Sequence, residues 1–298
     1  MDILKDLTNI MRGKRNERQE IAMTDKIIVE KIQTIDSTNL ELKRRVKTGD
    51  FSSNVLIADE QTAGRGRLGR TFESPDKTGL YMSLLIKVDF NTEETILITS
   101  AAAVAVARAI RNQTGREALI KWVNDIYIDN KKVCGILAEA VTSPDNETYI
   151  ILGIGVNIST TKENFSSEVS QIAGSLYSET SMTARQIELI KNELADKIIN
   201  EFYGIYDNLS ERTFLDDYRR WSLVIGKEVR FFMNEVWQNG KAVDIDDNGA
   251  LLVETDSDSN EDKNDEDSKD NSKDNSRDNS EKMIVKLNTG EITLRLQD

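Results

Sequence analysis

The stretch from residue 64 to 70 carries the residue types best suited to holding an anion. It reads Gly64-Arg65-Gly66-Arg67-Leu68-Gly69-Arg70, with three glycines and three arginines in seven residues. Glycine lets the backbone turn sharply and approach a ligand closely, and arginine offers a permanent charge with forked donors that suit phosphate and carboxylate groups. Because this stretch follows the strand-like run 55–59, we predict a loop that binds an anionic group.

The same loop matches the glycine pattern of a dinucleotide-binding motif. Its three glycines have that spacing, and Asp89 lies about twenty residues further on, as the motif requires. The motif must open a helix, however, and residues 71–79 contain a proline and a glycine where that helix would run. The sequence therefore disfavours a nicotinamide site and leaves a solvated basic loop as the plainer alternative.

A second polar stretch, Lys121-Trp122-Val123-Asn124-Asp125, interrupts the apolar run that we predict as a strand over 120–128. Polar groups buried in a strand need partners. Strand alternation places Lys121 and Asp125 on one face, where Lys132 arrives from the next strand. An exposed lysine–aspartate pair is the alternative interpretation.

A third stretch is Gly153-Ile154-Gly155-Val156-Asn157. Its glycines permit a close approach to a flat ligand, and the side chain of Asn157 is able to pair with the edge of a nucleobase. A glycine bulge in a core strand explains the same residues without a ligand.

The chain contains no histidine and one cysteine, Cys134, in an apolar run that predicts a buried residue. This composition excludes catalytic triads that need histidine, histidine zinc sites and an intramolecular disulfide. Chemistry at this site must use carboxylates, lysines, arginines, backbone amides or a hard cation such as magnesium. Such groups suit reactions driven by positioning and charge neutralisation, for example nucleotidyl transfer.

Net charge and hydropathy describe the setting of these motifs. Residues 254–282 hold 12 acidic and 5 basic residues, so the rest of the 298-residue chain carries only −6 of its −13. With almost no apolar residues, this segment predicts a disordered acidic insertion. No run approaches the roughly 18 apolar residues of a membrane span, and the start lacks a secretory signal, so we expect a cytoplasmic protein without membrane contact.

The elements that must position the motifs follow from periodicity and turn signals. A strand over 27–35 leads into a helix at Asp36-Ser37-Thr38-Asn39, for which Thr38 and Glu41 predict a capping box, with an end at Gly49. We predict further strands at 80–88, 132–141 and 149–158, and helices at 93–112, 184–208 and 214–221. Short strands from 224 on, with turns at 239–240 and 248–249 and completed by 283–287 and 291–296, predict a small β-barrel. The fold class is α+β: a mixed sheet with flanking helices over 23–223 and the barrel over 224–298, after an extension at 1–22.

Taken in order, these stretches resemble the biotin protein ligases across residues 27–225. The matching motifs are Asp36-Ser37-Thr38-Asn39, Gln61-Thr62-Ala63 with the arginine loop and Ser74-Pro75, Lys121 to Asp125, Lys132-Val133-Cys134-Gly135-Ile136-Leu137-Ala138-Glu139 and Gly153 to Ile158, and the chain end at 290–295 is similar too. Three features depart from the pattern: Val123 stands for a proline, Phe72 for a tryptophan, and the barrel carries the acidic insertion.

The resemblance implies a class II synthetase-like catalytic domain with an SH3-like barrel. It also implies a reaction in two steps. Biotin and ATP, which brings Mg²⁺ with it, give biotinyl-5′-AMP and pyrophosphate. A lysine on a biotin-carrier domain, of acetyl-CoA carboxylase or another biotin-dependent carboxylase, then attacks the adenylate.

The resemblance also implies roles for single residues. The biotin-binding positions are Ser37, Thr38, Asn39, Gln61, Arg65, Gly66, Arg67 and Lys132. The ATP or adenylate positions are Gly64, Arg65, Arg67, Arg70, Lys121, Asn157 and Arg295. The catalytic positions are Arg67 and Lys132, which together with Arg65 neutralise charge, and Asp125, which we expect to orient or deprotonate the incoming lysine. No residue is predicted as a direct metal ligand.

Alternatives from other classes remain at this stage. Lipoate–protein ligases also activate their acid as an acyl-adenylate, but they lack the Gly-Arg-Gly-Arg and Lys-Trp-x-Asn-Asp motifs. A non-catalytic adenylate sensor would bind biotin without turnover. Residues 1–22 are too few for a helix-turn-helix domain, so we expect no DNA binding. A homodimer paired through the strand at 80–88 is a further possibility.

Overall fold

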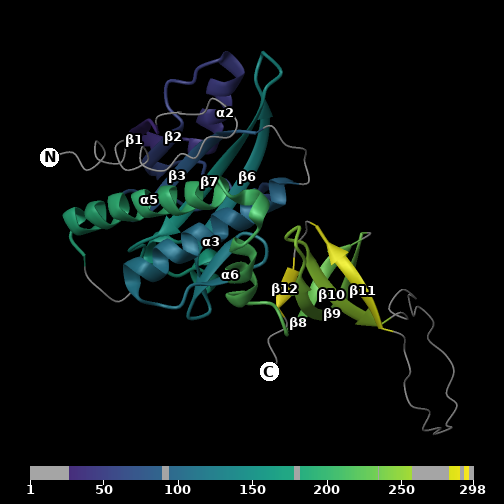
Figure 1. Cartoon of the computed structure of the whole chain (residues 1–298). Helices are drawn as coiled ribbons and strands as arrows, with labels where there is room; N and C mark the ends of the chain where they lie inside the picture. Colours follow the sequence, from purple (N-terminus) through teal and green to yellow (C-terminus); the bar gives the residue numbers. More distant parts are fainter. Residues whose placement is uncertain are drawn as a thin grey trace, which may run out of the picture.

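The computed structural model of the chain describes residues 27–88, 94–177, 182–233, 235–256, 282–288 and 292–294. Two sheets account for these residues (Figure 1). The predictions for the extension at 1–22, for most of the acidic insertion and for Arg295 lie outside the described residues.

The larger sheet has seven strands in the order β1-β2-β3-β7-β6-β5-β4 among the described residues. Strands β1 and β2 are parallel because α2 connects them, and every other neighbouring pair is antiparallel. Their bounds are β1 Val29–Ile35, β2 Val55–Gln61, β3 Gly79–Lys87, β4 Leu119–Lys121, β5 Asp125–Ile128, β6 Lys131–Thr142 and β7 Thr148–Asn157.

Helices cover both faces of this sheet (Figure 1). Helices α3 (Glu94–Thr114), α5 (Ala184–Tyr206) and α6 (Phe214–Arg220) share one core with one face of the strands. The run 101–107 of α3 is fully buried, as its alanines predict. Helix α2 (Thr38–Thr48) packs through Leu42 and Val46 on the opposite face. It ends at Gly49, whose φ of 73° lies in the left-handed region that favours a residue without a Cβ. None of the described helices is both long and apolar enough to span a membrane.

The shorter helical pieces flank the site described below. They are the α-helix α4 (Val169–Ile172) and the 3-10 turns Arg67–Gly69, Lys162–Asn164 and Leu209–Glu211.

The C-terminal module is an antiparallel sheet in the order β11-β10-β9-β8-β12. Its strands are β8 Glu228–Met233, β9 Val236–Ile245, β10 Leu251–Asp256, β11 Lys282–Leu287 and β12 Ile292–Leu294. The predicted limits of the acidic insertion are therefore too wide, because residues 254–256 belong to β10 and Lys282 to β11, with Asp256 paired with Lys282. The α+β class with a mixed sheet and a small antiparallel sheet is confirmed.

Of the two turns predicted in this module, one is confirmed. Residues 248–249 form the turn between β9 and β10, with Gly249 at φ 80°. The turn predicted at 239–240 is wrong, because both residues lie inside β9. A Cβ on Gly240 would lie 2.6 Å from the carbonyl oxygen of Glu254, so the glycine there permits a close strand contact instead of a turn.

The strand predicted over 120–128 is two strands. Residues 119–121 and 125–128 form a tight antiparallel hairpin, β4–β5, and the Trp122–Val123 peptide bond within its turn is cis. Lys121 and Asp125 do share a face, but as partners directly opposite each other across the hairpin and not as alternate residues of one strand.

Two further expectations are wrong. Ser37 is the N-cap of α2, while the Thr38 hydroxyl donates to Gln61 and the Glu41 carboxylate binds arginines, so no capping box forms. Strand β3 is paired on both sides, with β2 and β7, and therefore has no free edge for pairing across a dimer.

Candidate functional site

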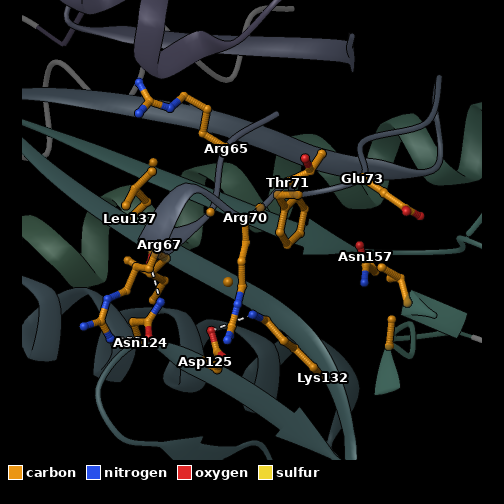
Figure 2. A pocket seen from close by; sticks show the side chains of 18 of the residues that line it. Arg65, Arg67, Arg70, Thr71, Glu73, Asn124, Asp125, Lys132, Leu137 and Asn157 are labelled. Atoms are coloured by element: carbon orange, nitrogen blue, oxygen red, sulfur yellow. Dashed lines mark hydrogen bonds and ion pairs between the residues drawn. The ribbon is translucent and has the colours of Figure 1, made fainter. Parts of the chain in front are cut away.

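A cavity of about 730 Å³ lies between the arginine loop, the start of α2 and the strands β5, β6 and β7 (Figure 2). Most residues predicted for the site line it: Ser37, Thr38, Asn39, Gln61, Arg65, Gly66, Arg67, Arg70, Lys121, Asp125, Lys132 and Asn157. Among the described candidates only Gly64 does not line it. A Cβ on Gly64 would lie 2.3 Å from the Phe72 carbonyl oxygen, so this glycine serves the folding of the loop.

The arginine loop folds back on itself instead of opening a helix. The amide of Gly66 donates to the carbonyl of Arg70 at 2.7 Å, and the amide of Phe72 donates to Gly64 at 2.9 Å. Leu68 and Gly69 lie inside the loop that both bonds close, and their positive φ angles of 55° and 75° reverse the direction of the chain there. This geometry excludes the strand–turn–helix arrangement of a dinucleotide motif.

Cationic side chains gather at one wall of the cavity. Arg67 donates through Nη1 to Asn124 Oδ1 at 3.2 Å, and Lys132 Nζ lies 2.8 Å from Asp125 Oδ1. Figure 2 shows Arg70 extending from the loop toward Asp125 and Lys132. Positive groups held in place around a space of this size are suited to bind and neutralise phosphate oxygens.

Arg65 points away from this cluster. Its guanidinium lies 3.4 Å from Glu139 Oε1, on the side of the loop that faces α2 (Figure 2). The structure therefore brings Arg67, Arg70 and Lys132 together and leaves Arg65 apart from them.

Another part of the cavity is lined by neutral hydrogen-bonding groups at the start of α2. Gln61 Oε1 accepts from the amide and the hydroxyl of Thr38, at 2.9 and 3.1 Å, while its Nε2 donates to Ser74 Oγ at 2.9 Å. Ser37, Thr38 and Asn39 are all buried. Buried, oriented amide and hydroxyl groups of this kind suit a neutral polar ligand.

Both ends of the Asn39 amide are occupied by this chain's own residues. Ser83 Oγ lies 2.6 Å from Oδ1, and Nδ2 donates to Glu139 Oε2 at 3.0 Å. Neither Ser83 nor Glu139 was predicted as a site residue, although Glu139 ends one of the motifs that carry the resemblance. Each has apolar residues directly on both sides in its strand, which is the signal that a buried partner exists.

The glycines of β7 make room for protein side chains. A Cβ on Gly153 would lie 2.3 Å from Asn39 Oδ1, and one on Gly155 would lie 2.4 Å from the ring of Phe72. The same ring lies 3.2 Å from the Cβ position of Gly135 on β6. Phe72 thus forms an aromatic wall over β6 and β7, and the glycines admit it where we expected them to admit a flat ligand.

Asn157 lies at the far side of the cavity from Arg67 (Figure 2). Its Nδ2 donates to the carbonyl of Gly174 at 3.0 Å, which fixes the orientation of the amide. Its Oδ1 is buried and has no partner within the described part of the chain. A buried acceptor without a donor is costly, so this atom is poised to accept a hydrogen bond from a ligand.

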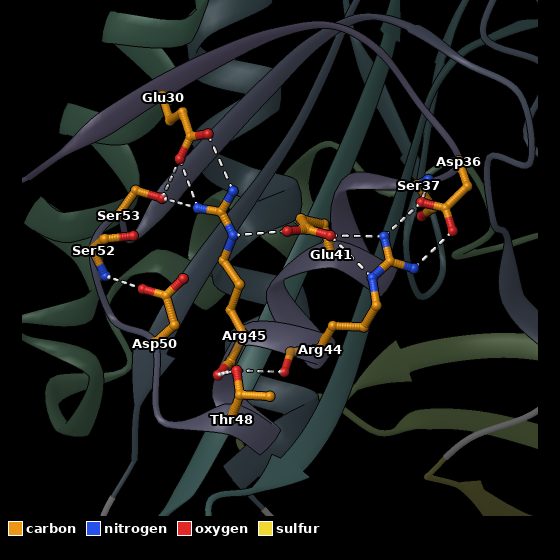
Figure 3. A network of polar contacts seen from close by, with 10 residues as sticks. All are labelled: Glu30, Asp36, Ser37, Glu41, Arg44, Arg45, Thr48, Asp50, Ser52 and Ser53. Carbon is orange, nitrogen blue, oxygen red and sulfur yellow. Dashed lines mark hydrogen bonds and ion pairs between the residues drawn. The ribbon is translucent and has the colours of Figure 1, made fainter.

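A charged network holds the start of α2 in place (Figure 3). Arg44 donates to both oxygens of Asp36, at 2.8 and 2.9 Å, and Asp36 Oδ1 also accepts from the amide of Ser37 at 2.7 Å. Arg45 bridges Glu30 and Glu41. The Arg44 guanidinium lowers the pKa of Asp36 to about 2.

This network predicts a pH-dependent loss of stability. A carboxyl whose pKa is lower in the folded protein stabilises the fold above its unfolded pKa of about 3.9, and this contribution disappears as pH falls toward its folded pKa. The free energy of unfolding of Asp36→Asn should therefore be lower than that of the parent at pH 7, with a difference that shrinks toward pH 2. Urea denaturation across this range measures it. Asp216→Asn, an exposed carboxylate 3.6 Å from Arg219, is the control, and an equal pH profile for both variants would contradict the assignment.

Burial raises the pKa of other groups around the cavity. The pKa of Tyr127 is raised to about 12 by desolvation, with a further contribution from Asp125. The Cys134 thiol is buried, as predicted, and desolvation is the main cause of its raised pKa. In the described ranges no three Asp, Glu, His or Cys side chains gather as a metal site.

The comparisons with known proteins agree with this geometry. Residues 31–157 match the model of the biotin/lipoate A/B protein ligase family, and residues 224–295 match that of the biotin protein ligase C terminal domain. The chain is 35% identical over 224 residues to the bifunctional ligase/repressor BirA of Bacillus spizizenii, covering 74% of this chain and 67% of that protein. It spans 61% of the Bacillus subtilis relative of the same name.

Other relatives match more of their own length. The chain is 31% identical to the biotin–[acetyl-CoA-carboxylase] ligase of Mycobacterium tuberculosis, covering 73% of this chain and 80% of that protein. The biotin protein ligase of Aquifex aeolicus, solved in complex with biotin and ATP, aligns with a TM-score of 0.64 at 25% identity over 90% of this chain and 99% of the other. Both domains, the order of the motifs and the cavity agree: the chain belongs to the biotin protein ligase family.

Proposed function

We propose that this chain joins biotin to ATP, giving biotinyl-5′-AMP and pyrophosphate, and then transfers the biotinyl group to a lysine of a biotin-carrier domain. One observation supports this proposal above the others. A single cavity presents neutral hydrogen-bonding groups at the start of α2, the cations of the arginine loop and β6, and a buried acceptor at Asn157.

The first step brings two anions together. An oxygen of the biotin carboxylate attacks the α-phosphorus of ATP, and the bond to pyrophosphate breaks. Arg67, Arg70 and Lys132 offset the repulsion between the two groups and the charge that develops on the leaving pyrophosphate. Magnesium bound to ATP would neutralise part of the remaining phosphate charge.

The neutral part of the cavity is proposed for the ring system of biotin. Its ureido group offers two N–H donors and one carbonyl acceptor, which match the amide of Gln61 and the hydroxyls of Ser37 and Thr38. Asn39 keeps its place in this wall through Ser83 and Glu139. The carboxylate at the end of the biotin side chain then reaches toward Gly66 and the cations.

Asp125 is proposed for the second step. The lysine of the carrier domain must lose a proton before its amine attacks the carbonyl carbon of the adenylate, and AMP leaves. Asp125 lines the cavity and is paired with Lys132, so it is placed to orient that amine or accept its proton. Asp125→Asn is expected to slow both partial reactions.

The test of this function is pyrophosphate release from ATP and magnesium with biotin, lipoate or octanoate as the acid. Biotin-dependent release, with a biotinyl mass gain on one lysine of an added biotin-carrier domain, supports the proposal. Release with lipoate or octanoate only would assign the chain to lipoate-type transfer. Biotin binding without release from any acid would identify a sensor and would overturn the catalytic roles.

Asn157 gives a separate prediction about the nucleotide. The 6-amino group of adenine is a donor that satisfies the buried Oδ1, whereas guanine presents an acceptor at the same place. We expect Asn157→Ala to raise the KM for ATP about tenfold, the effect of losing one buried hydrogen bond. The KM for biotin should change less than twofold. Steady-state kinetics with each substrate varied in turn checks this, and an equal rise in both values would contradict an adenine contact.

Four expectations stay predictions: a nucleotide contact of Arg295, a homodimer through a surface other than β3, the absence of DNA binding and a cytoplasmic location.

A further inference from the structure

The turn between β4 and β5 carries two residues of the proposed site. Asn124, in the turn, accepts from Arg67 Nη1, and Asp125, which follows it, binds Lys132. Three residues without glycine or proline, 122–124, make this turn. Its position therefore depends on contacts from outside the hairpin.

Two such contacts hold the turn from behind. The hydroxyl of Tyr218 on α6 donates to the carbonyl of Val123 at 2.9 Å, and Trp122 Nε1 donates to the carbonyl of Gly249 at 3.0 Å. Tyr218 is fully buried, and Trp122 is 4% exposed. Gly249 belongs to the β9–β10 turn of the small sheet, so one of the two contacts comes from the C-terminal module.

The same two elements are fastened to each other. Arg219, next to Tyr218 on α6, donates through Nε to the carbonyl of Ile245 at 2.6 Å and through Nη2 to Asp247 Oδ1 at 2.6 Å. Helix α6 and the β9–β10 turn therefore act as one support, and α6 lies beside the small sheet in Figure 1.

On its other side the turn is bound to β6. Asn124 Nδ2 donates to the carbonyl of Ile136 at 2.6 Å, and the amide of Ile136 donates back to the carbonyl of Asn124 at 3.0 Å. A shift of the turn would therefore move the Asn124 amide, and with it the group that receives Arg67.

We propose that Tyr218 is a positioning residue for adenylate formation. Together with the β9–β10 turn it holds the Trp122–Asn124 turn so that Asn124 and Asp125 face Arg67 and Lys132. Tyr218 is not among the described residues that line the cavity, so it acts through the turn and not by touching a substrate. This inference rests on the proposed function, because it assigns Asn124 and Asp125 a part in that reaction.

The test compares Tyr218→Phe with Tyr206→Phe. Both variants remove one tyrosine hydroxyl that donates to a backbone carbonyl, since Tyr206, at the end of α5, donates to the carbonyl of Lys87 at 3.2 Å. Tyr218→Phe leaves the Val123 carbonyl buried without this donor. We expect it to lower kcat for biotin-dependent pyrophosphate release about tenfold. The dissociation constant for biotin without ATP should stay within twofold, because the biotin wall lies at the start of α2.

A second readout does not depend on activity. The chain has three tryptophans, so 5-fluorotryptophan labelling gives three ¹⁹F resonances, and Trp122→Phe assigns the one of interest. In Tyr218→Phe the Trp122 resonance should shift or broaden while that of Trp237, at the distal β8–β9 hairpin, stays in place. Tyr206→Phe should leave both resonances and kcat as in the parent.

The outcomes separate this inference from the proposed function. If the Trp122 resonance does not move in Tyr218→Phe, Tyr218 does not hold the turn. If the resonance moves while kcat stays unchanged, Tyr218 holds the turn but has no positioning role in the reaction. A fall in kcat accompanied by an equal loss of biotin binding shows general destabilisation and also overturns it. If the parent itself releases no pyrophosphate with biotin, the proposed function fails, and with it the role in positioning, while the resonance still decides whether Tyr218 holds the turn.

Discussion

Replacing Lys132 by methionine is expected to lower kcat/KM for biotin-dependent pyrophosphate release by about 10³. Lys132 is a half-buried cation, and a unit charge about 4 Å from another contributes on the order of 4 kcal/mol at the effective dielectric constant of such sites. Its charge is needed most when the carboxylate and the α-phosphate meet. Stopped-flow detection of pyrophosphate measures the loss, and binding of biotin alone should weaken much less.

Two further variants decide how the Lys132 result is interpreted. Lys132→Met also leaves the Asp125 carboxylate without its partner, which would itself disturb the site. In the double variant Lys132→Met/Asp125→Asn that carboxylate is neutral, so recovery to the activity of Asp125→Asn alone would show that the stranded charge caused the loss. Lys87→Met, which breaks an ion pair of 3.1 Å with Glu147 away from the cavity, should keep the parent's activity.

Local signals in the sequence were sufficient for much of the fold. Asp129 and Asn130 are residue types that favour turns, and both have positive φ angles, 48° and 60°, between β5 and β6. Gly49 ends α2 for the same reason. The strand over 120–128 was wrong because Trp122, Val123 and Asn124 carry no turn signal. The turn is instead bound by Tyr218 and Gly249, which lie 95 and 127 residues further along the chain than their partners.

In the candidate site, too, local sequence signals predicted some features and contacts between distant residues determined the others. Residue types predicted which side chains would line the cavity, but they did not predict their partners. Asn39 meets Glu139 across 100 residues of sequence, and Gly153 accepts the Asn39 side chain where the sequence suggested a ligand. Arg65 forms an ion pair with the same Glu139 and therefore lies apart from Arg67. Pairings of this kind depend on strand order and register, which the sequence motifs do not specify.

The second large effect is expected from Arg67→Gly, which should release biotinyl-5′-AMP about 10² times faster than the parent. Arg67 reaches the cavity from the arginine loop, and its side chain is oriented by a hydrogen bond to Asn124. It is therefore able to hold the phosphate of the adenylate with charge-assisted hydrogen bonds. Losing about 2 to 3 kcal/mol of such contacts gives this factor. The rate of pyrophosphate release should fall much less, because Lys132 and Arg70 remain.

Single-turnover formation of labelled adenylate, followed by rapid filtration at increasing times, measures how long the protein retains it. Arg67→Lys keeps the charge but loses the forked donors, so its retention time should lie between those of the parent and Arg67→Gly. Asn124→Ala removes the hydrogen bond that orients Arg67 and should shorten retention while leaving the arginine in place. If Arg67→Gly retained the adenylate as long as the parent, the loop arginine would have no part in holding the intermediate, and Arg70 and Lys132 would have to account for it.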